Sequence, residues 1–249
     1  MQFNLNVRLG NWYRRNSGRL SFQRRVALNL SKPIISFSFD DFPKSALHIG
    51  GAILKDRGLT GTYYVSLGLL GTEAPAGLLC TEEDLAIAMR EGHELGCHTY
   101  SHCDSWNTES GAFERALIQN REALSTIAPG ASFRTFSYPI SSPRPSVKRV
   151  SARHFAGCRG GGQVSNLRVA DLNQLSAYFL EKACGDSRPI RDIIEQNRRA
   201  KGWLIFATHD VCSEPSPYGC DAEFFREVVE ESVRSDSRIL TVADALDII

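Results

Sequence analysis

Short apolar runs alternate with amphipathic segments along most of the chain. The runs are rich in β-branched and aromatic residues and are bounded by Gly, Pro or charged positions, a pattern typical of buried strands. They lie at residues 34–39, 61–67, 92–98, 133–138, 155–158, 203–208 and 238–242. The intervening segments have helical spacing, at residues 44–57, 81–91, 110–127, 145–153, 189–200, 224–234 and 243–249. Residues 171–181 fit a strand and a helix equally well.

The alternation of strands and helices indicates the fold class. It repeats about seven times, and repeated strand–helix units predict a parallel sheet. The sequence contains no linker, low-complexity tract or internal repeat. We therefore predict a single α/β domain whose sheet is barrel-like. In such barrels the carboxyl ends of the strands carry the chemistry.

Composition narrows the class of partner and the compartment. Hydrophobic residues make up 42% of the 249 residues and charged residues 23%, as in ordinary globular proteins. The formal net charge of +1 argues against a nucleic-acid partner, which would require a strong basic excess. No run is long enough for a transmembrane helix, and residues 1–30 lack the apolar region of a signal peptide. We therefore expect a cytoplasmic protein. The sequence does not indicate its oligomeric state.

The first 31 residues differ from the rest because they are basic and polar. We expect residues 1–31 to form an N-terminal extension packed on the barrel. A solvated extension or an amphipathic membrane-surface segment is the alternative.

The cysteines do not suggest a framework of disulfides or a zinc ribbon. Their number, seven, is odd, and no Cys-x2-Cys pair occurs. Free thiols in a reducing compartment are the simplest interpretation. Cys97 and Cys103 flank two histidines closely enough for thiolate ligation of a metal to be an alternative.

The candidate chemistry begins where the run 34–39 ends in two adjacent carboxylates, Asp40 and Asp41. Two buried acids are costly unless a cation meets them. His98 and His102 lie four positions apart, and one carboxylate with two imidazoles can hold a divalent metal and leave positions open. The second carboxylate would then act as a base. Each motif alone fits a structural role as well, but their combination favours a metal site.

The order and spacing of these motifs resemble carbohydrate esterase family 4, the polysaccharide deacetylases with a NodB-homology domain. The resemblance covers residues 32–245. The segment Ser38-Phe39-Asp40-Asp41-Phe42 is similar to the family's Thr-Phe-Asp-Asp-Gly. Residues 98–102 match its His-(Ser/Thr)-x-x-His fully, and the apolar run that ends at His209 matches its last motif.

The resemblance implies a distorted (β/α)7 TIM-like barrel, with residues 32–249 as the catalytic domain. It implies that Asp40 is the catalytic base and His209 the catalytic acid. It also implies a divalent metal on a carboxylate and two imidazoles, Asp41, His98 and His102. Zinc suits this set best, and cobalt, iron or nickel are alternatives. The implied substrate is an acetylated carbohydrate, an N-acetylglucosamine-containing polysaccharide or oligosaccharide that loses its N-acetyl groups.

Two motifs depart from the family pattern. The third, usually Arg-x-Pro-(Tyr/Phe)-Gly, is replaced by residues 137–141, and Ser137 stands where the arginine would. Arg134 faces the other way in a regular strand, so we do not expect it to compensate. The backbone N–H of Ile140 is the expected oxyanion donor, and Tyr138 is a candidate substrate contact. The fourth motif, an Asp-Trp pair that orients the catalytic histidine, has no counterpart, so the sequence assigns no partner to His209.

Other functions fit the same residues. An alternative keeps the site and changes the substrate to another amide, a cyclic imide or an O-acetyl ester. The altered third and fourth motifs also fit a non-catalytic sugar-binding domain that kept the barrel.

Overall fold

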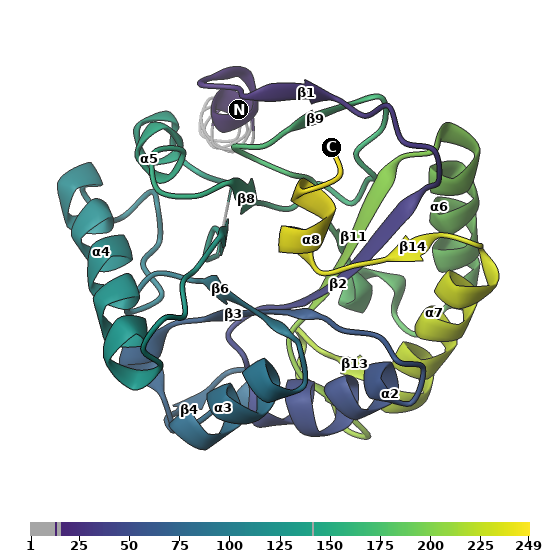
Figure 1. Ribbon diagram of the computed structural model, residues 1–249, viewed down its shortest axis with the longest axis horizontal. Coiled ribbons are helices and arrows are strands. Elements are labelled where there is room, and N and C mark those ends of the chain that lie inside the picture. The colour runs from purple at the N-terminus through teal and green to yellow at the C-terminus, as the bar shows by residue number, and fades with distance from the viewer. Residues whose placement is uncertain (1–12, 14–15, 141) are drawn as a thin grey trace, which may run out of the picture.

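The main sheet is parallel and curls into an incomplete barrel (Figure 1). The structure is a computed structural model that describes residue 13, residues 16–140 and residues 142–249. Within these residues the strand order is β10, β11, β2, β3, β6, β7, β8, and β14 pairs with the start of β2. The strands are β2 (Ile34–Phe39), β3 (Thr62–Val65), β6 (Glu94–Cys97), β7 (Thr135–Ser137), β8 (Gly157–Arg159), β10 (Tyr178–Phe179), β11 (Trp203–Thr208) and β14 (Arg238–Ile239).

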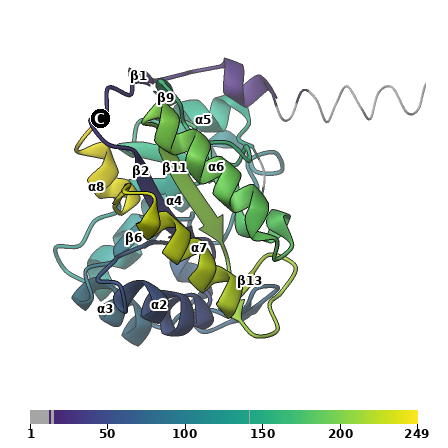
Figure 2. The same ribbon diagram turned by 90° about the vertical axis from the view of Figure 1, so that its right-hand side faces the viewer.

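Helices cover the outside of this sheet. They are η1 (Ala46–Gly51) running into α2 (Ala52–Lys55), α3 (Glu82–Arg90), α4 (Ser110–Ile127), α5 (Pro145–Ser151), α6 (Ser187–Ala200) and α7 (Ala222–Arg234). The last helix, α8 (Val242–Leu246), lies instead within the ring of strands in Figure 1. Figure 2 shows α6 and α7 side by side over β11, and α8 contacts β2 and β8. No helix within the described ranges is both long and apolar enough to cross a membrane.

Smaller elements form the rim and one outer edge. The rim contains η2 (Leu67–Leu69), the hairpin β4 (Glu73–Ala74) and β5 (Gly77–Leu78), η3 (Leu180–Ala183), and the pair β12 (Val211–Cys212) and β13 (Cys220–Asp221). At the outer edge, β1 (Arg25–Ala27) pairs antiparallel with β9 (Val169–Asp171).

The two central strands, β2 and β11, are buried at every position because helices cover one face and the barrel interior the other. Their two serines are still satisfied. The Ser38 hydroxyl donates to the Phe206 carbonyl at 2.9 Å, and the Trp203 indole donates to the Ser36 hydroxyl at 3.0 Å. Burial therefore leaves neither serine hydroxyl of these two strands unpaired.

The predicted fold class, a distorted (β/α)7 barrel, is confirmed by the strand order and the surrounding helices. Three elements, at residues 34–39, 110–127 and 203–208, have the predicted bounds. The segment 171–181 is neither one strand nor one helix. It contains the end of β9, a turn, β10 and the start of η3. Pieces this short show no period, which explains why the sequence fitted both alternatives.

The N-terminal segment lies against the barrel where the structure describes it. The Arg24 guanidinium donates to the Ala156 carbonyl at 2.6 Å. The buried Lys148 ammonium donates to the Gly18 carbonyl at 2.8 Å and pairs with Asp171 at 2.5 Å. The predicted extension also includes residues 1–12, 14 and 15, which lie outside the described residues. Its division from the domain after residue 31 therefore stays a prediction.

Each of the seven cysteines is a free thiol. Cys97 is buried, and its sulfur accepts a hydrogen bond from the Asn120 amide at 3.2 Å. Cys103 is half-buried, and its sulfur lies 3.4 Å from the Ser101 hydroxyl. The alternative of thiolate ligation gains no support, because neither sulfur belongs to the cluster of metal-ligating groups found in the described residues.

A buried histidine behind this sheet gives a stability prediction. His93 is buried, and its Nδ1 accepts the Gly61 N–H at 3.0 Å, so the fold requires the neutral ring. Burial lowers the pKa of His93, against the opposing effect of Glu91. The unfolded chain, with an ordinary pKa near 6.5, binds more protons than the folded one below that pH.

We therefore expect the free energy of unfolding to fall as the pH drops below about 6.5. Urea unfolding of the metal-free protein between pH 8 and pH 5 measures this slope. His93→Gln should be less stable at pH 8, because it loses the packed ring, but should show a smaller loss over this range. An equal slope in the two proteins would contradict the role of His93.

Candidate metal centre and active site

Three predicted ligands lie together at the carboxyl ends of two strands. Asp41 follows β2, while His98 and His102 lie in the turn that follows β6. The Asp41 Oδ1 atom is 3.5 Å from His98 Nε2 and 3.2 Å from His102 Nε2. Their ligand atoms lie within 4.8 Å of one another, and no other such group of three occurs in the part of the chain that the structure describes.

The imidazole of His98 is prepared to act as a ligand. Its Nδ1 lies 2.8 Å from the Ser137 carbonyl and donates to it, which leaves the Nε2 lone pair directed at Asp41. Burial lowers the pKa of His98 to about 4, despite the nearby Asp40 carboxylate that raises it. A neutral imidazole is the form that binds a metal. The donor set of one carboxylate and two imidazoles thus fits a divalent cation.

Sharp turns after the strands give these side chains their directions. Left-handed backbone at non-glycine residues is uncommon and costs about 1–3 kcal/mol each. It occurs here at Asp41, Phe42, Thr99, His102 and Ile140, with φ between 54° and 66°. The surrounding structure holds these turns, because the Cys80 N–H donates to the Phe42 carbonyl and the Cys103 N–H to the Thr99 hydroxyl, both at 2.9 Å.

The second carboxylate, Asp40, is buried beside this cluster. The Ser137 hydroxyl donates to its Oδ1 at 3.2 Å, and the Arg159 guanidinium forms an ion pair with the same oxygen. Burial alone would raise the pKa of Asp40. The guanidinium, helped by His98 and His209, outweighs burial and lowers the pKa to about 2. Asp40 is therefore a carboxylate at neutral pH.

Arg159 was not among the residues predicted from the sequence. It ends β8, one residue beyond the predicted strand, and its side chain is 1% exposed. Arg134, the other arginine considered, pairs with the exposed Asp247 and lines no part of the cleft, as expected from its place in the predicted strand. The available signal for Arg159 was a single charged residue between an apolar segment and three glycines at a strand end.

The structure also provides the partner of His209 that the sequence did not. His209 follows β11, and its Nδ1 donates to the Tyr218 carbonyl at 3.1 Å. Nε2 is consequently the atom that faces the cluster, 4.0 Å from Asp41 Oδ2. The imidazole also stacks on Phe179, with ring centres 6.4 Å apart. A backbone carbonyl and an aromatic ring thus orient this histidine.

Comparison with known proteins agrees with this geometry. The family profile described as polysaccharide deacetylase matches residues 27–156, just over half of the chain. The chain belongs to the polysaccharide deacetylase family. No curated protein sequence matches it significantly.

Solved structures of carbohydrate esterase family 4 share the fold of this chain. The chitin deacetylase of Colletotrichum lindemuthianum is 15% identical, with a TM-score of 0.64 and coverage of 89% of this chain and 91% of that one. An acetyl xylan esterase from Clostridium thermocellum, in complex with a cobalt ion, is 16% identical, with a TM-score of 0.59 and coverage of 86% and 90%. A family 4 pseudoenzyme from Bacillus anthracis is 13% identical, with a TM-score of 0.57 and coverage of 87% and 66%.

The candidate residues of this chain share one cleft of about 810 Å³. Asp40, Asp41, His98, His102 and His209 all line it. Its other walls come from the β4–β5 hairpin, the glycines after β8, η3 and the N-terminal segment; they include Glu73, Gly160, Gly161, Gly162, Lys182 and Arg19. Residues far apart in the sequence therefore meet at one end of the barrel, as predicted.

The two predicted substrate contacts also line the cleft but differ in exposure. Ile140 is 69% exposed and lines the cleft. Tyr138 is 5% exposed, and its hydroxyl donates to the Asn173 carbonyl at 3.0 Å, which makes much of its ring part of the core. Tyr218, 48% exposed and next to His209, presents an accessible aromatic ring.

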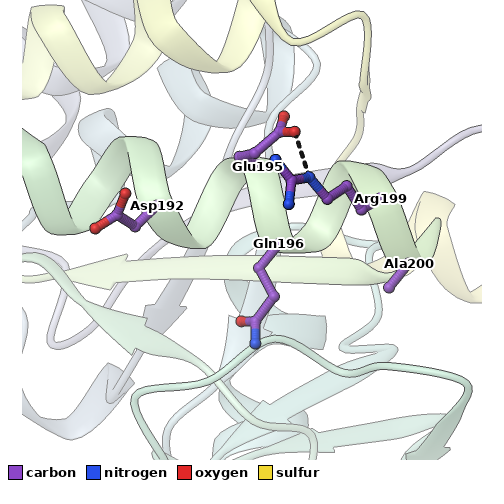
Figure 3. A pocket seen from close by; sticks show the side chains of 5 residues that line it. All are labelled: Asp192, Glu195, Gln196, Arg199 and Ala200. Carbon is purple, nitrogen blue, oxygen red and sulfur yellow. Dashed lines mark hydrogen bonds and ion pairs between the residues drawn. The ribbon is translucent and has the colours of Figure 1, made fainter.

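Another hollow lies on α6, away from these residues. Figure 3 shows its five lining side chains and the ion pair between Glu195 and Arg199 at 2.6 Å. One helix supplies all of its lining, and no group of three metal ligands is found there among the described residues. The cleft at the strand ends is therefore the candidate active site.

Proposed function

We propose that this deacetylase is a metal-dependent hydrolase that removes N-acetyl groups from an N-acetylglucosamine-containing polysaccharide or oligosaccharide. One observation carries the proposal. A buried carboxylate, Asp40, and an oriented imidazole, His209, flank the Asp41–His98–His102 cluster in a single cleft. We assign this activity to residues 32–249, with residues 1–31 as an extension.

Asp41, His98 and His102 would hold the metal, zinc being the expected ion and cobalt, iron or nickel the alternatives. When bound, the metal supplies a Lewis acid that polarises the acetyl carbonyl and activates a water molecule. The chain contributes a ligand set in the correct protonation state, because the Ser137 carbonyl fixes the tautomer of His98.

Asp40 is the residue that accepts the proton of the attacking water. It remains ionised because Arg159 offsets its burial, and the hydroxyl of Ser137 fixes one of its oxygens. No hydrogen bond to the other oxygen, Oδ2, is found among the described residues, so Oδ2 is the atom that would take the proton. General base catalysis of this kind typically contributes about 10²–10⁴ in rate.

His209 is the residue that protonates the departing nitrogen. An amine anion leaves poorly, so amide cleavage requires an acid at this position. Donation of Nδ1–H to the Tyr218 carbonyl leaves Nε2 to carry the transferred proton. The Ile140 N–H is the proposed donor to the oxyanion, since a backbone donor survives replacement of the side chain. Tyr138 is a proposed contact of the substrate.

The direct test is hydrolysis by the full chain. We expect the zinc-loaded protein to release acetate and free amine from N-acetylglucosamine oligomers, and the chelated protein to release neither until zinc is restored. Release of acetate from O-acetylated xylan alone would instead indicate an esterase. No turnover of an acetylated sugar or of an aryl acetate by the metal-loaded protein would favour a non-catalytic domain.

His102→Ala tests the ligand assignment separately from turnover. We expect the metal content to fall from about one ion per chain to a small fraction of that at equal free metal, with the far-UV spectrum unchanged. His154→Ala is the matched control, because His154 bonds to Glu114 and Arg121 and lines no part of the cleft. Full metal content in His102→Ala would show that the ligand set is wrong.

A further inference from the structure

Two residues that support Asp40 are direct neighbours across two strands. In the parallel pairing of β7 and β8, Ser137 is the partner of Arg159. Partners in a parallel register point to the same face of the sheet, so both side chains face the barrel interior and the cleft. Both are buried, at 0% and 1% exposure.

Because the side chain of Ser137 on β7 is small, the longer side chain of Arg159 on β8 can extend across it to the Asp40 carboxylate. Arg159 Nη2 donates to the Ser137 hydroxyl at 2.5 Å and pairs with Asp40 Oδ1. The Ser137 hydroxyl in turn donates a hydrogen bond to the same oxygen at 3.2 Å. A longer side chain at residue 137 would occupy the place of the guanidinium.

Aromatic rings hold the guanidinium in this place. Its central carbon lies 5.1 Å from the centre of the Tyr64 ring and 5.3 Å from that of Phe179. Tyr64 can lie there because its partner on β6 is Gly96, where a Cβ atom would come within 2.4 Å of the ring. Nη1 donates to the Gly160 carbonyl at 3.1 Å. These contacts hold the Arg159 guanidinium in one orientation, and its ion pair therefore orients the Asp40 carboxylate.

We propose that Arg159 is the positioning residue of the catalytic base Asp40. Arg159 reaches Asp40 from β8 across residue 137 of β7, which must therefore have a small side chain. The role of Asp40 as a base rests on the proposed function, whereas the positioning of its carboxylate by Arg159 does not depend on that function. Phe179 also stacks on His209. The same ring therefore contacts both Arg159, which positions Asp40, and His209, the proposed acid. Arg159 itself transfers no proton.

Exchange of the two side chains is the sharpest test. We expect Arg159→Ser to lower kcat about 10²-fold or more with KM changed only a few-fold, because a carboxylate displaced by about 1 Å loses this much. The double variant Ser137→Arg, Arg159→Ser restores a guanidinium from the neighbouring strand, and we expect it to recover at least about tenfold over the single variant. A purely structural role would not give this recovery.

Two further variants define the chemistry. Arg159→Lys keeps the charge without the planar fork, and we expect an intermediate kcat. Arg134→Ser is the matched control, because it removes a guanidinium that pairs with the exposed Asp247 and lines no part of the cleft. We expect it to leave kcat unchanged. Thermal unfolding and metal analysis of each variant identify any that fail to fold or to bind metal.

Crystal structures give a readout that does not depend on turnover. We expect the Asp40 carboxylate to rotate away from its present orientation in Arg159→Ser and to return in the double variant. If the wild type hydrolyses no acetylated substrate, the proposed function fails, and these structures still decide the positioning role. An unchanged Asp40 orientation in Arg159→Ser, or an unchanged kcat, would overturn the proposal. Failure of the folded double variant to recover would overturn the inference that a guanidinium beside Asp40 is what positions the carboxylate.

Discussion

Replacing Asp40 by Asn is expected to lower kcat for N-acetyl hydrolysis by about 10³–10⁴-fold, while metal content stays near that of the wild type. An amide oxygen cannot accept the proton of the attacking water. Asn nevertheless has the shape of Asp, and its oxygen can still accept the hydrogen bonds from Ser137 and Arg159. The loss should therefore fall on kcat rather than on the architecture of the cleft.

The measurement compares steady-state hydrolysis and metal content in the same preparations. Asp221→Asn is the matched control, because Asp221 caps α7 away from the cleft and Asn caps a helix about as well. Replacing an ion pair by a neutral amide leaves the buried Arg159 charge without its counter-charge, so a lower melting temperature is also expected. A near-normal kcat in the metal-loaded Asp40→Asn protein would sink the assignment of the base.

The sequence predicted the fold most accurately where an element is buried on both sides or is long. Residues 34–39 and 203–208 read as continuous apolar runs because β2 and β11 lie at the centre of the sheet. Helix α4 has eighteen residues over which its apolar spacing is evident. Elements of two or three residues, such as β10 and the β4–β5 hairpin, depend on tertiary contacts and left no such pattern.

The candidate site could be predicted only where its residues belong to local motifs. Asp40 and Asp41 are adjacent, and His98 and His102 are separated by three residues, so each pair was visible along the chain. The position of Arg159 depends on the register between β7 and β8, which brings it beside Ser137 from 22 residues away. The Tyr218 carbonyl is a backbone group, and no side-chain motif could indicate it.

The third motif is altered and the fourth is absent, but other groups in the cleft support Asp40 and His209. The absence of an arginine at residue 137 suggested an unsupported base, yet a guanidinium pairs with Asp40 in the structure. The absence of an Asp-Trp pair suggested an unsupported imidazole, yet His209 has a hydrogen-bond partner and a stacked ring. Both features weaken the argument for a non-catalytic domain that the sequence left open.

His209→Ala is expected to separate the enzyme from a binding domain and the acid from other roles. We expect hydrolysis of the N-acetylated oligosaccharide to fall by about 10²–10⁴-fold, because the nitrogen must be protonated as it leaves. An activated aryl acetate has a leaving group that needs no proton, so its hydrolysis should fall less than about tenfold. His154→Ala, outside the cleft, should change neither rate.

The ratio of the two losses decides between interpretations. Removal of the imidazole also leaves the Tyr218 carbonyl and the Phe179 ring without their partner, so some loss on both substrates is expected from a looser rim. That structural loss is common to amide and ester, whereas the loss of a proton donor is confined to the poor leaving group. Equal losses on both substrates would therefore show that His209 stabilises the cleft or the oxyanion and does not donate the proton that the departing amine requires.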